Sequence, residues 1–518
     1  MKYTFNTFYE LIAYQGKKRK NKVALLVDDT KITYGSILEN ADNLAVYLQE
    51  KGVKEGDKVA LFLRNSPEFI YSIFAVSKLG AVLVPINTFL KEEELSYILE
   101  NSESTFLIAS DIHKKVVNAS SASTLCHTIL WEGVEADTLE KGVQAHFAEV
   151  MQVNGTIDTV EKTLDDIALF IYTSGTTGKP KGAMLSNKNV LSNTESGKRT
   201  INVKPKDRAI VFLPMFHSFT FSIGVMLPLY TGASIVIIKS IQPFSNIFKQ
   251  TLTKRVTLFF GIPDVYNALA KAKLPWYFMW FNSVRAFISG AAALQPKTLA
   301  AMAKKFKRAT LLEGYGLSEA SPAVCMNTFK KQKAGSVGTA LYGYEMKIVD
   351  EDMTEVPRGG IGDIIVNGDN VMQGYLNLPE ATEETLVNGW LLTGDVGYMD
   401  DEGFLFIVDR KKDLIISKGI NIYPREIEEV VDGFAGVGLS AVVSVFDEKS
   451  GEAPIVYIEL AEDVQHLDEM ALKKYMKEHL ANYKIPKQIH IIDALPKNAT
   501  GKILKRVLKD KLKNDTLT

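Results

Sequence analysis

A short segment rich in glycine and hydroxyl side chains carries the most chemical information in this chain. It reads YTSGTTGKPKG from Tyr172 to Gly182 and follows the apolar run DDIALFIY, which predicts a buried strand. Glycines free backbone N–H groups, and together with hydroxyls and lysines these are the donors that a polyphosphate requires. The segment is not a Walker A loop, because no glycine stands five residues before a Gly-Lys-Ser/Thr. We therefore expect nucleotide phosphate chemistry of another kind, the alternative being a flexible polar loop.

Four further motifs follow this segment along the chain. They are LEGYGLSEASP from Leu312, GWLLTGDVG from Gly389, DRKKDLIISKGINIYPREIE from Asp409 and PKNATGKILKR from Pro496. In their order and spacing, the five motifs resemble the superfamily of adenylate-forming enzymes that contains acyl-CoA synthetases, adenylation domains and luciferases. The resemblance covers essentially the whole chain and is strongest to bacterial fatty acid–CoA ligases.

The resemblance implies a reaction in two steps. The family uses Mg-ATP to convert a carboxylate into an acyl adenylate and pyrophosphate, and a thiol then displaces AMP. Because an anionic carboxylate must attack an anionic α-phosphate, catalysis depends on positioning and on fixed positive charge. The resemblance implies that Lys502 supplies this charge during adenylation, and that Glu319 and Thr173 are the oxygen ligands of Mg²⁺.

The resemblance also implies a set of residues that bind ATP and coenzyme A. In the motifs that match, Tyr315 would lie along the adenine, Asp395 would accept hydrogen bonds from the ribose, and Arg410 would reach the ribose or the phosphates. Taken singly, these residues could instead be structural or surface residues. The implied nucleotide- and thiol-binding set is Thr173, Ser174, Gly175, Thr176, Thr177, Gly178, Lys179, Glu313, Gly314, Tyr315, Gly316, Ser318, Asp395, Arg410, Gly419 and Lys502.

In the family, a small C-terminal domain rotates between the two steps. The rotation would withdraw Lys502 from the active site and bring the backbone at Gly419 to the channel of the thiol. Lys412 matches the position of the hinge. One active site would thus serve two reactions by exchanging the face that closes it.

The segment LPMFHSFTFSIG, from Leu213 to Gly224, matches the part of the family that lines the acyl pocket. It contains no acidic residue to pair with an amino acid's ammonium group, and its apolar residues suit a fatty or an aromatic acid. We expect a medium- to long-chain fatty acid, with a cinnamate-like acid as the alternative. The resemblance implies that His217 is a movable gate between the pocket and the nucleotide, and with Lys502 and Glu319 it forms the expected catalytic set. The alternative is that His217 is a core histidine. The expected pocket residues are Phe216, His217, Phe219, Phe260, Gly290 and Ala323.

The acceptor that the resemblance favours is coenzyme A, and acyl carrier protein stays open as an alternative acceptor. A luciferase-like oxygenase is disfavoured because Ile416 stands where that branch usually has a lysine. A non-catalytic sensor of nucleotide or acyl ligand is the hypothesis of another class. The presence of Glu319, Asp395, Arg410 and Lys502 together speaks against it.

Composition sets broader limits on function and location. The chain has 518 residues, 46% of them hydrophobic, and a formal net charge of -1, which argues against nucleic acid as a partner. Its two cysteines, Cys126 and Cys325, suit a reducing cytoplasm. No apolar run approaches the length of a membrane span, and the N-terminus lacks the apolar core of a signal peptide. We expect a cytoplasmic protein, with peripheral membrane contact left open.

The order of apolar runs predicts an α/β protein of more than one domain. Strands and helices alternate from Val23 to about Pro85, and the alternation recurs around DRAIVFL, ASIVIIK and VTLFFGI. Between Gly335 and Gly403, short strands alternate with glycine turns and predict a small β-rich subdomain. The expected fold is a large N-terminal domain of layered α/β subdomains and a β-rich subdomain (1–408), a hinge (409–412) and a mobile α+β C-terminal domain (413–518).

Overall fold

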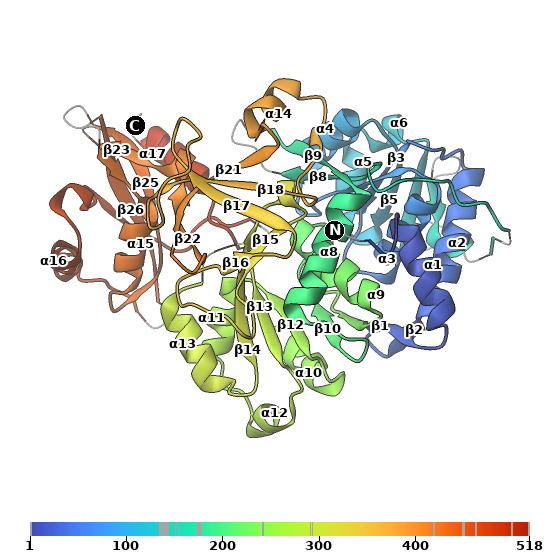
Figure 1. Cartoon of the computed structure of the whole chain (residues 1–518), viewed down its shortest axis with the longest axis horizontal. Helices are drawn as coiled ribbons and strands as arrows, with labels where there is room; N and C mark the ends of the chain where they lie inside the picture. Colours follow the sequence, from blue (N-terminus) through green and yellow to red (C-terminus); the bar gives the residue numbers. More distant parts are fainter. Residues whose placement is uncertain are drawn as a thin grey trace.

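The computed structural model confirms the expected fold class, with layered α/β sheets, a β-rich subdomain and a small α+β C-terminal domain (Figure 1). Within the described part of the chain, the strands form four sheets. The structure describes residues 3–133, 144–150, 152–153, 155–173, 179–240, 243–290, 292, 294–417, 420–447, 451–461, 464–498 and 501–515.

The first large sheet is parallel in its centre and antiparallel at the edge that carries β9 and β19. Its central strands are apolar on both faces, as strands covered by helices on both sides must be. In spatial order the strands are β19 (Gly374–Tyr375), β9 (Lys181–Ser186), β8 (Ile167–Thr173), β4 (Val82–Pro85), β3 (Lys58–Phe62), β5 (Ser104–Ser110), β6 (Thr128–Glu132) and β7 (Gln144–His146).

The second large sheet is parallel from β14 to β1 and has antiparallel strands at both edges. The expected strand around KVALLVDD is β1, and the structure adds β2, which returns beside it as a hairpin. The spatial order is β16 (Thr339–Ala340), β15 (Ala323–Met326), β14 (Thr310–Gly316), β13 (Ala286–Ser289), β12 (Leu258–Gly261), β10 (Arg208–Val211), β11 (Ser234–Ile237), β1 (Val23–Val27) and β2 (Thr30–Thr33).

The two smaller sheets build the β-rich subdomain and the C-terminal domain. The subdomain contains β17 (Tyr344–Val349), β18 (Gly362–Gly368), β21 (Trp390–Met399) and β20 (Leu386–Val387), with β22 (Leu405–Arg410) beside β21. The C-terminal domain contains β24 (Ile420–Ile422), β23 (Ile415–Ser417), β26 (Gly451–Leu460) and β25 (Val437–Asp447), with β27 (Ile489–Ile492) beside β26.

The helices cover the sheets and fill the space between them. Five of them (α3, α11, α13, α14 and α15) begin at a proline, whose fixed φ and missing N–H suit the first helical position. Helices of the N-terminal domain are α1 (Phe8–Lys18), α2 (Tyr34–Glu50), α3 (Pro67–Lys78), α4 (Glu92–Ser102), α5 (Lys114–Ala119), α6 (Ala122–Leu125), α7 (Phe147–Val150), α8 (Asn187–Ile201), α9 (Leu227–Thr231), α10 (Ser245–Thr253), α11 (Pro263–Lys271), α12 (Trp276–Phe281), α13 (Pro296–Lys305) and α14 (Pro379–Thr385). The C-terminal domain adds α15 (Pro424–Asp432), α16 (Glu469–His479) and α17 (Lys505–Asp515).

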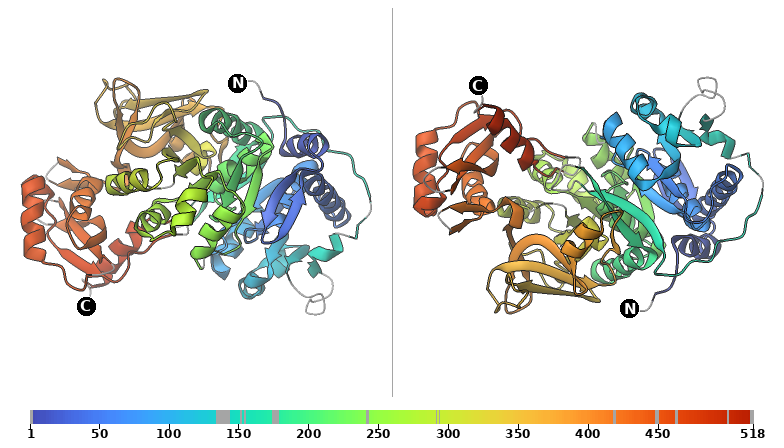
Figure 2. Two further views of the ribbon diagram at one scale, coloured as in Figure 1. Left: turned by 90° about the horizontal axis from the view of Figure 1, so that it is seen from below. Right: turned by 90° about the horizontal axis from the view of Figure 1, so that it is seen from above.

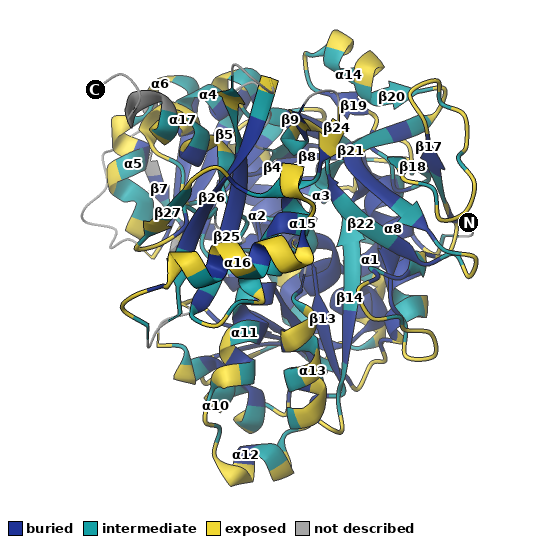
Figure 3. Ribbon diagram, turned by 90° about the vertical axis from the view of Figure 1, so that its left-hand side faces the viewer, coloured by how far each residue is buried: buried dark blue, intermediate teal, exposed yellow. Residues whose placement is uncertain are grey.

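The largest apolar core lies between the two large sheets and is filled by α1, α2, α3, α8 and α9. Figure 2 shows the C-terminal domain at one end of the molecule and the eight-stranded sheet at the other. The nine-stranded sheet and the β-rich subdomain lie between them. Colouring by burial shows dark strands inside and exposed residues on the outer helices (Figure 3).

Candidate active site

Several of the predicted site residues lie at the carboxyl ends of parallel strands. Thr173 ends β8, Glu313 to Gly316 end β14, and Gly290 directly follows β13. In the second sheet, Gly261 pairs with Ser289 and Ser289 with Glu313, so three strand ends are in register at one edge. Ligands of open parallel sheets bind at this edge, because loops there diverge and leave a crevice. The strand register therefore brings distant motifs to one place.

The phosphate-binding segment is the connection of an antiparallel hairpin. Thr173 in β8 pairs with Lys181 in β9, and Thr173 Oγ1 lies 3.5 Å from the carbonyl of Lys181. The ammonium of Lys179 lies 5.1 Å from the ring centre of Tyr97. The predicted phosphate ligands Ser174, Gly175, Thr176, Thr177 and Gly178 lie outside the described residues. Two lysines in the described residues that follow Gly178 are therefore held beside aromatic rings: Lys179 beside Tyr97, and Lys181 beside Tyr375.

Glu319 lies in the short helical turn Ser318–Ala320 and is bound to the neighbouring sheet through Tyr375 in β19. The Tyr375 hydroxyl donates a 2.9 Å hydrogen bond to Glu319 Oε1, and the ammonium of Lys181 lies 5.1 Å from the centre of the Tyr375 ring. The backbone of Met372 also donates to the carbonyl of Glu319, at 2.8 Å. Tyr375 thus stands between the end of the phosphate segment and the carboxylate predicted to bind Mg²⁺.

The oxygens at this place suit Mg²⁺, which prefers hard oxygen ligands and keeps few protein ligands when phosphates are present. The described residues contain no cluster of three or more His, Cys, Asp or Glu side chains arranged for a metal ion. The predicted ligands Glu319 and Thr173 offer a carboxylate and a hydroxyl oxygen, which are donors of the type that Mg²⁺ takes.

Asp395 has both carboxylate oxygens engaged in a polar frame. It is 6% exposed and faces Arg410 across the β21–β22 pair. Arg410 Nε lies 3.3 Å from Oδ1, and the hydroxyl of Tyr315 donates to Oδ2 at 2.6 Å. Burial and the neighbouring carboxylate raise the pKa of Tyr315, so its hydroxyl keeps its proton. The residues predicted to bind adenine and ribose therefore meet at one corner.

Lys502 reaches the same corner from the C-terminal domain. Burial and, next, the positive charge of Arg410 lower the pKa of Lys502 to about 7, and Asp395 opposes this shift. The lysine sits in a tight turn, because Gly501 N–H donates to the carbonyl of Asn498 and Lys502 N–H to its side chain, each at 2.9 Å. Gly501 has φ of +74°, a conformation that favours glycine. Gly501 and Lys502 are thus both anchored to Asn498.

Contacts between the two domains hold the turn there. The ammonium of Lys497 lies 3.1 Å from Asp264 in α11, and a Cβ at Gly501 would lie 3.0 Å from Ile262. On the other side of the interface, Gln295 donates to Asp432 at 2.6 Å. These polar contacts are the kind that two domains break and remake during rotation.

Arg425 and Asp409 connect the domains at the predicted hinge. Asp409 accepts from the backbone N–H groups of Arg410, at 2.7 Å, and Arg425, at 2.8 Å. Strand β22 extends through Arg410, and a single helical turn, Lys411–Asp413, follows it. Gly419 lies outside the described residues, and its described neighbours Ile416 and Ile420 are exposed.

The remaining residues of the LEGYG motif shape the end of β14. A Cβ at Gly316 would lie 1.9 Å from the carbonyl oxygen of Pro322, so this glycine is required by the close approach of the chain to itself. A Cβ at Gly314 would meet Met326 at 3.0 Å. Burial raises the pKa of Glu313 to about 7, against the opposing charge of Arg425. Glu313 therefore lies within electrostatic reach of the C-terminal domain.

Three of the predicted acyl-pocket residues meet. The rings of Phe219 and Phe260 are 6.4 Å apart at 79°, and a Cβ at Gly290 would lie 3.2 Å from the Phe219 ring. Ala323 belongs to the same apolar cluster as Phe260. The glycine therefore lets the Phe219 ring pack directly against its backbone.

Phe216 lies in a different apolar cluster, 6.4 Å from Phe89. The separation arises because the chain turns after it and continues as the π-helical segment Thr220–Met226. Such segments are rare and are frequent at functional sites. The described structure therefore gives Phe216 and Phe219 different neighbours despite their closeness in sequence.

His217 stands at this turn in its neutral form. Burial lowers its pKa to about 4. Its Nδ1 accepts from the backbone N–H of Phe219 at 3.3 Å, so the proton of the neutral ring resides on Nε2. Next to it, the hydroxyls of Ser218 and Ser318 lie 3.0 Å apart and connect the acyl segment to the LEGYGLSE motif.

Comparison with known proteins decides the family. The profile described as AMP-binding enzyme matches residues 12–376, and the profile of the AMP-binding enzyme C-terminal domain matches residues 426–502. The chain belongs to the AMP-binding enzymes. This places it in the adenylate-forming superfamily, as the five motifs predict, and makes it an AMP-forming acid–thiol ligase.

Curated relatives and solved structures align with this AMP-binding enzyme along nearly its whole length. It is 34% identical to the feruloyl-CoA synthase of Amycolatopsis sp, over 92% of this chain and 93% of that protein. It is 32% identical to the long-chain-fatty-acid–CoA ligase of Salmonella typhimurium, over 98% and 94%. The structure of ATP-bound MatB from Rhodopseudomonas palustris superposes with a TM-score of 0.88 and 30% identity, over 98% and 99%, whereas apo MatB gives 0.78.

Sequence reasoning missed two tyrosines of this AMP-binding enzyme, Tyr375 and Tyr97. Tyr375 lies in QGYLNLPEAT, outside the five motifs, and only its pairing with Ala183 in β9 brings it to Glu319. Tyr97 lies on α4, and its hydroxyl donates to the carbonyl of Pro180 at 3.3 Å. A lone tyrosine carries little signal by itself, so the sequence offered no means to find either.

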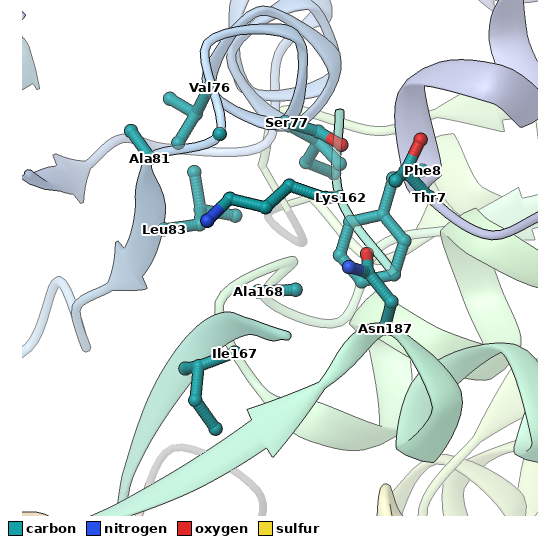
Figure 4. A pocket seen from close by; sticks show the side chains of 12 residues that line it. Thr7, Phe8, Val76, Ser77, Ala81, Leu83, Lys162, Ile167, Ala168 and Asn187 are labelled. Atoms are coloured by element: carbon teal, nitrogen blue, oxygen red, sulfur yellow. The ribbon is translucent and has the colours of Figure 1, made fainter. Parts of the chain in front are cut away.

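A small hollow on the opposite side of the first sheet is not part of the site (Figure 4). Its lining includes Phe8, Ala168 and Lys162, and its volume of about 10 Å³ is room for a single water. Lys162 pairs with Glu55 at 2.6 Å. The hollow is therefore a packing gap under α1 and α3.

Proposed function

We propose that this AMP-binding enzyme joins a medium- to long-chain fatty acid to coenzyme A, through an acyl adenylate and with release of AMP and pyrophosphate. The observation that carries the proposal is the ion pair of Asp395 with Arg410, which lies within electrostatic reach of Lys502 from the C-terminal domain. These residues come from three motifs and two domains.

In the first half-reaction, an oxygen of the fatty carboxylate attacks the α-phosphorus of ATP, and pyrophosphate leaves with the electron pair of the broken bond. Two anions must approach each other, so the step requires positive charge fixed near both. We assign that role to the Lys502 ammonium, with Arg410 beside it. Asp395 would hold the ribose hydroxyls, and Tyr315 would lie along the adenine. Mg²⁺ held by Glu319 and Thr173 would neutralise the phosphate charge.

The domain arrangement supports this assignment of the first half-reaction. The higher TM-score to ATP-bound than to apo MatB favours a closed, adenylation-type arrangement. The exposure of Ile416 in β23 and of Ile420 in β24 is consistent with it, because these two described residues lie on the outside. We infer that the C-terminal domain rotates about residues 409–412, with Lys412 at the pivot. The rotation brings β23 and β24 inward for the second half-reaction, in which the thiol attacks the acyl adenylate. The N-terminal and C-terminal domains would then comprise residues 1–408 and 413–518.

The proposed acid follows from the residues around Phe219. Phe219, Phe260, Gly290 and Ala323 supply an apolar wall with small positions in it. His217 is neutral and lacks the charge that would select a second polar group on the acid. Each buried methylene contributes about 0.8 kcal/mol, or roughly a fourfold gain in affinity, for as long as the pocket has room. The apolar wall favours an apolar acyl group, and we propose that this group is a long alkyl chain.

An aromatic acid is the second candidate, and the 34% identity to a feruloyl-CoA synthase favours it. A planar ring would lie against Phe219 and Phe260 at their observed spacing of 6.4 Å. Acyl carrier protein is the alternative acceptor for the same adenylation step.

The test is ATP-dependent AMP release by the purified protein with a panel of acids and both acceptors. The fatty acids of the panel have roughly six to eighteen carbons. Within this range we expect kcat/KM with coenzyme A to rise about fourfold for each added methylene and then to level off. Turnover only with cinnamate-type acids would show that the substrate is an aromatic acid and not a fatty acid. Turnover only with carrier protein would replace the acceptor, and no AMP release with any acid would contradict the proposed function.

A further inference from the structure

Helix α12 carries four large aromatic side chains on its outer face. Its sequence is WYFMWF, and the exposed fractions are 72% for Trp276, 46% for Tyr277, 65% for Trp280 and 67% for Phe281. Positions 276, 277, 280 and 281 share one side of a helix, because they are one and four residues apart. Contiguous exposed aromatic surface is uncommon on a protein that interacts only with water, and it marks an interaction site.

The orientation of α12 is fixed by its inner face. Phe278 is buried, and its ring lies 5.8 Å from that of Phe248 at the end of an aromatic series that includes Phe244. Met279 packs against the same core. The helix therefore cannot roll its outer aromatics inward without removing Phe278 from the core.

The chain around α12 is positively charged and lacks acidic residues. Between Asp264 and Glu313 there is no aspartate or glutamate, whereas this stretch contains eight lysines and arginines. The exposed cations are Lys271, Lys273, Lys297, Lys304, Lys307 and Arg308. Within the described residues, Lys271, Lys273, Lys304 and Lys307 form no ion pair. This concentration of charge contrasts with a net charge of -1 for the whole chain.

Hydrogen bonds and a ring contact place several of these cations at the base of α12. Lys305 donates to the carbonyls of Leu269 and Ala270 at the end of α11, which brings the end of α13 beside Lys271. Arg308 donates to the carbonyl of Trp280 at 3.0 Å, and its guanidinium lies 5.8 Å from the Trp280 ring. Lys307 and Arg308 also line a hollow of about 190 Å³ with Trp280. Lys307 and Arg308 thus lie beside Trp280, at the base of the aromatic face.

The shape of this surface favours a bilayer over a protein. Figure 1 and Figure 3 show α12 at a projecting tip of the molecule, away from the C-terminal domain. A protein partner requires a broad complementary surface, about 800 Å² on each side, which a projecting single turn-and-a-half of helix does not supply. Tryptophan, tyrosine and phenylalanine on a tip surrounded by lysine and arginine are the residues that enter the interface of an anionic membrane.

We propose that α12 and the cations around it (Lys271, Lys273, Lys304, Lys307 and Arg308), here called the α12 tip, dock the protein peripherally on a bilayer that contains anionic lipids. The aromatic side chains enter the headgroup region, and the cations contact lipid phosphates. Within the described residues, no helix combines the length and the apolar character needed to cross a membrane, so the contact is with one face of the bilayer. This inference concerns the surface alone and does not rest on the acid or the acceptor of the reaction.

The test is sedimentation of the full-length protein with vesicles of phosphatidylcholine and phosphatidylglycerol, compared with phosphatidylcholine alone. We expect binding to the anionic vesicles that weakens as salt rises toward about 1 M. The triple variant Trp276→Ser, Trp280→Ser, Phe281→Ser should lower the partition coefficient about tenfold or more. The matched control is Phe446→Ser, a 79% exposed aromatic residue in β25, which should leave binding unchanged.

A second set of variants tests the charges. Lys271→Gln, Lys273→Gln, Lys307→Gln should remove most of the preference for anionic over neutral vesicles, whereas the control Lys473→Gln, Lys474→Gln, Lys477→Gln on α16 should not. All variants should keep wild-type AMP release with a soluble short-chain acid, which reports correct folding. No vesicle binding by the wild type, or equal losses in the control variants, would overturn the proposal. Binding of an acidic carrier protein in place of vesicles through the same residues would also overturn it.

Discussion

The hydroxyl of Tyr315 donates a 2.6 Å hydrogen bond to Asp395 Oδ2, while Arg410 Nε lies 3.3 Å from Oδ1 of the same carboxylate. Tyr315 comes from the end of a parallel strand in the second sheet, and Asp395 and Arg410 face each other in the β-rich subdomain. The three side chains therefore fix the relative position of two sheets and orient the carboxylate that we assign to the ribose.

Asp395→Ala should lower the affinity for ATP roughly ten- to hundredfold, because hydrogen bonds to a charged group contribute about 1.5–3 kcal/mol. The loss should be specific to the ribose. The wild type should bind ATP more tightly than 2′,3′-dideoxy-ATP, and Asp395→Ala should bind the two nucleotides equally. Calorimetric titration of both proteins with both nucleotides measures this. A variant that still prefers ATP would assign the ribose to other residues.

Tyr375→Phe should raise the Mg²⁺ concentration needed for half-maximal adenylation about fivefold. The hydroxyl orients Glu319 through a 2.9 Å hydrogen bond, and such bonds contribute about 1 kcal/mol. The matched control is Tyr97→Phe, which removes a hydroxyl from the other side of the same segment without touching Glu319. Pyrophosphate release measured against Mg²⁺ compares the two. A rate that falls equally at all Mg²⁺ concentrations would indicate a structural role only.

The pH dependence of adenylation should report Lys502. Burial and nearby positive charge lower its pKa to about 7, so the ammonium is present below pH 7 and is lost as the pH rises. Because kcat/KM reports groups of the free enzyme, it should fall above pH 7, and kcat should fall only at higher pH, since bound phosphate favours the ammonium.

Glu313 titrates in the same range, because burial raises its pKa to about 7. Glu313→Gln removes that group and should leave the descending limb of kcat/KM in place. A descending limb that disappears in Glu313→Gln would transfer the pH dependence from the lysine to the glutamate.

Gly290→Val should shift the preference toward shorter acids. A Cβ at this position would lie 3.2 Å from the Phe219 ring, so the larger side chain would press against the aromatic wall that Phe219 forms with Phe260. We expect the ratio of kcat/KM for long over short fatty acids to fall about tenfold, which corresponds to one or two buried methylenes. The ratio also controls for folding, because a loss of folded protein would lower kcat/KM for long and short acids by the same factor. An unchanged ratio would place the acyl chain elsewhere.

Much of the fold was predictable because its strands are buried on both faces and its helices bury one face. The runs around Val59, Ile210 and Phe259 are continuous and apolar, and each is a parallel strand. Helix α2 lies in the stretch where strands and helices were expected to alternate, and it ends at Glu50, shortly before Gly52, which has φ of +97°. The pairing order was not predictable, because neighbouring strands such as β1 and β11 are far apart in sequence.

The chemistry of the site was easier to predict from sequence than its geometry. Motif residues such as Lys502 and Asp395 are recognisable by type and spacing, whereas their proximity depends on how two domains meet. Gly316 illustrates the difference, since its requirement comes from the carbonyl of Pro322 at 1.9 Å from the would-be Cβ. Phe216 and Phe219 illustrate it too, because the turn between them sends the two rings into different clusters.

The most direct test of the account is pyrophosphate release by Lys502→Ala with ATP and a fatty acid, measured beside ATP binding by the same protein. Removal of a charge fixed near the reacting phosphate should lower the adenylation rate about 10²–10³-fold. ATP affinity should stay within about threefold, because most phosphate and ribose contacts come from other residues. Thioester formation from synthetic acyl adenylate and coenzyme A should proceed at the wild-type rate. Normal pyrophosphate release by Lys502→Ala would contradict the account.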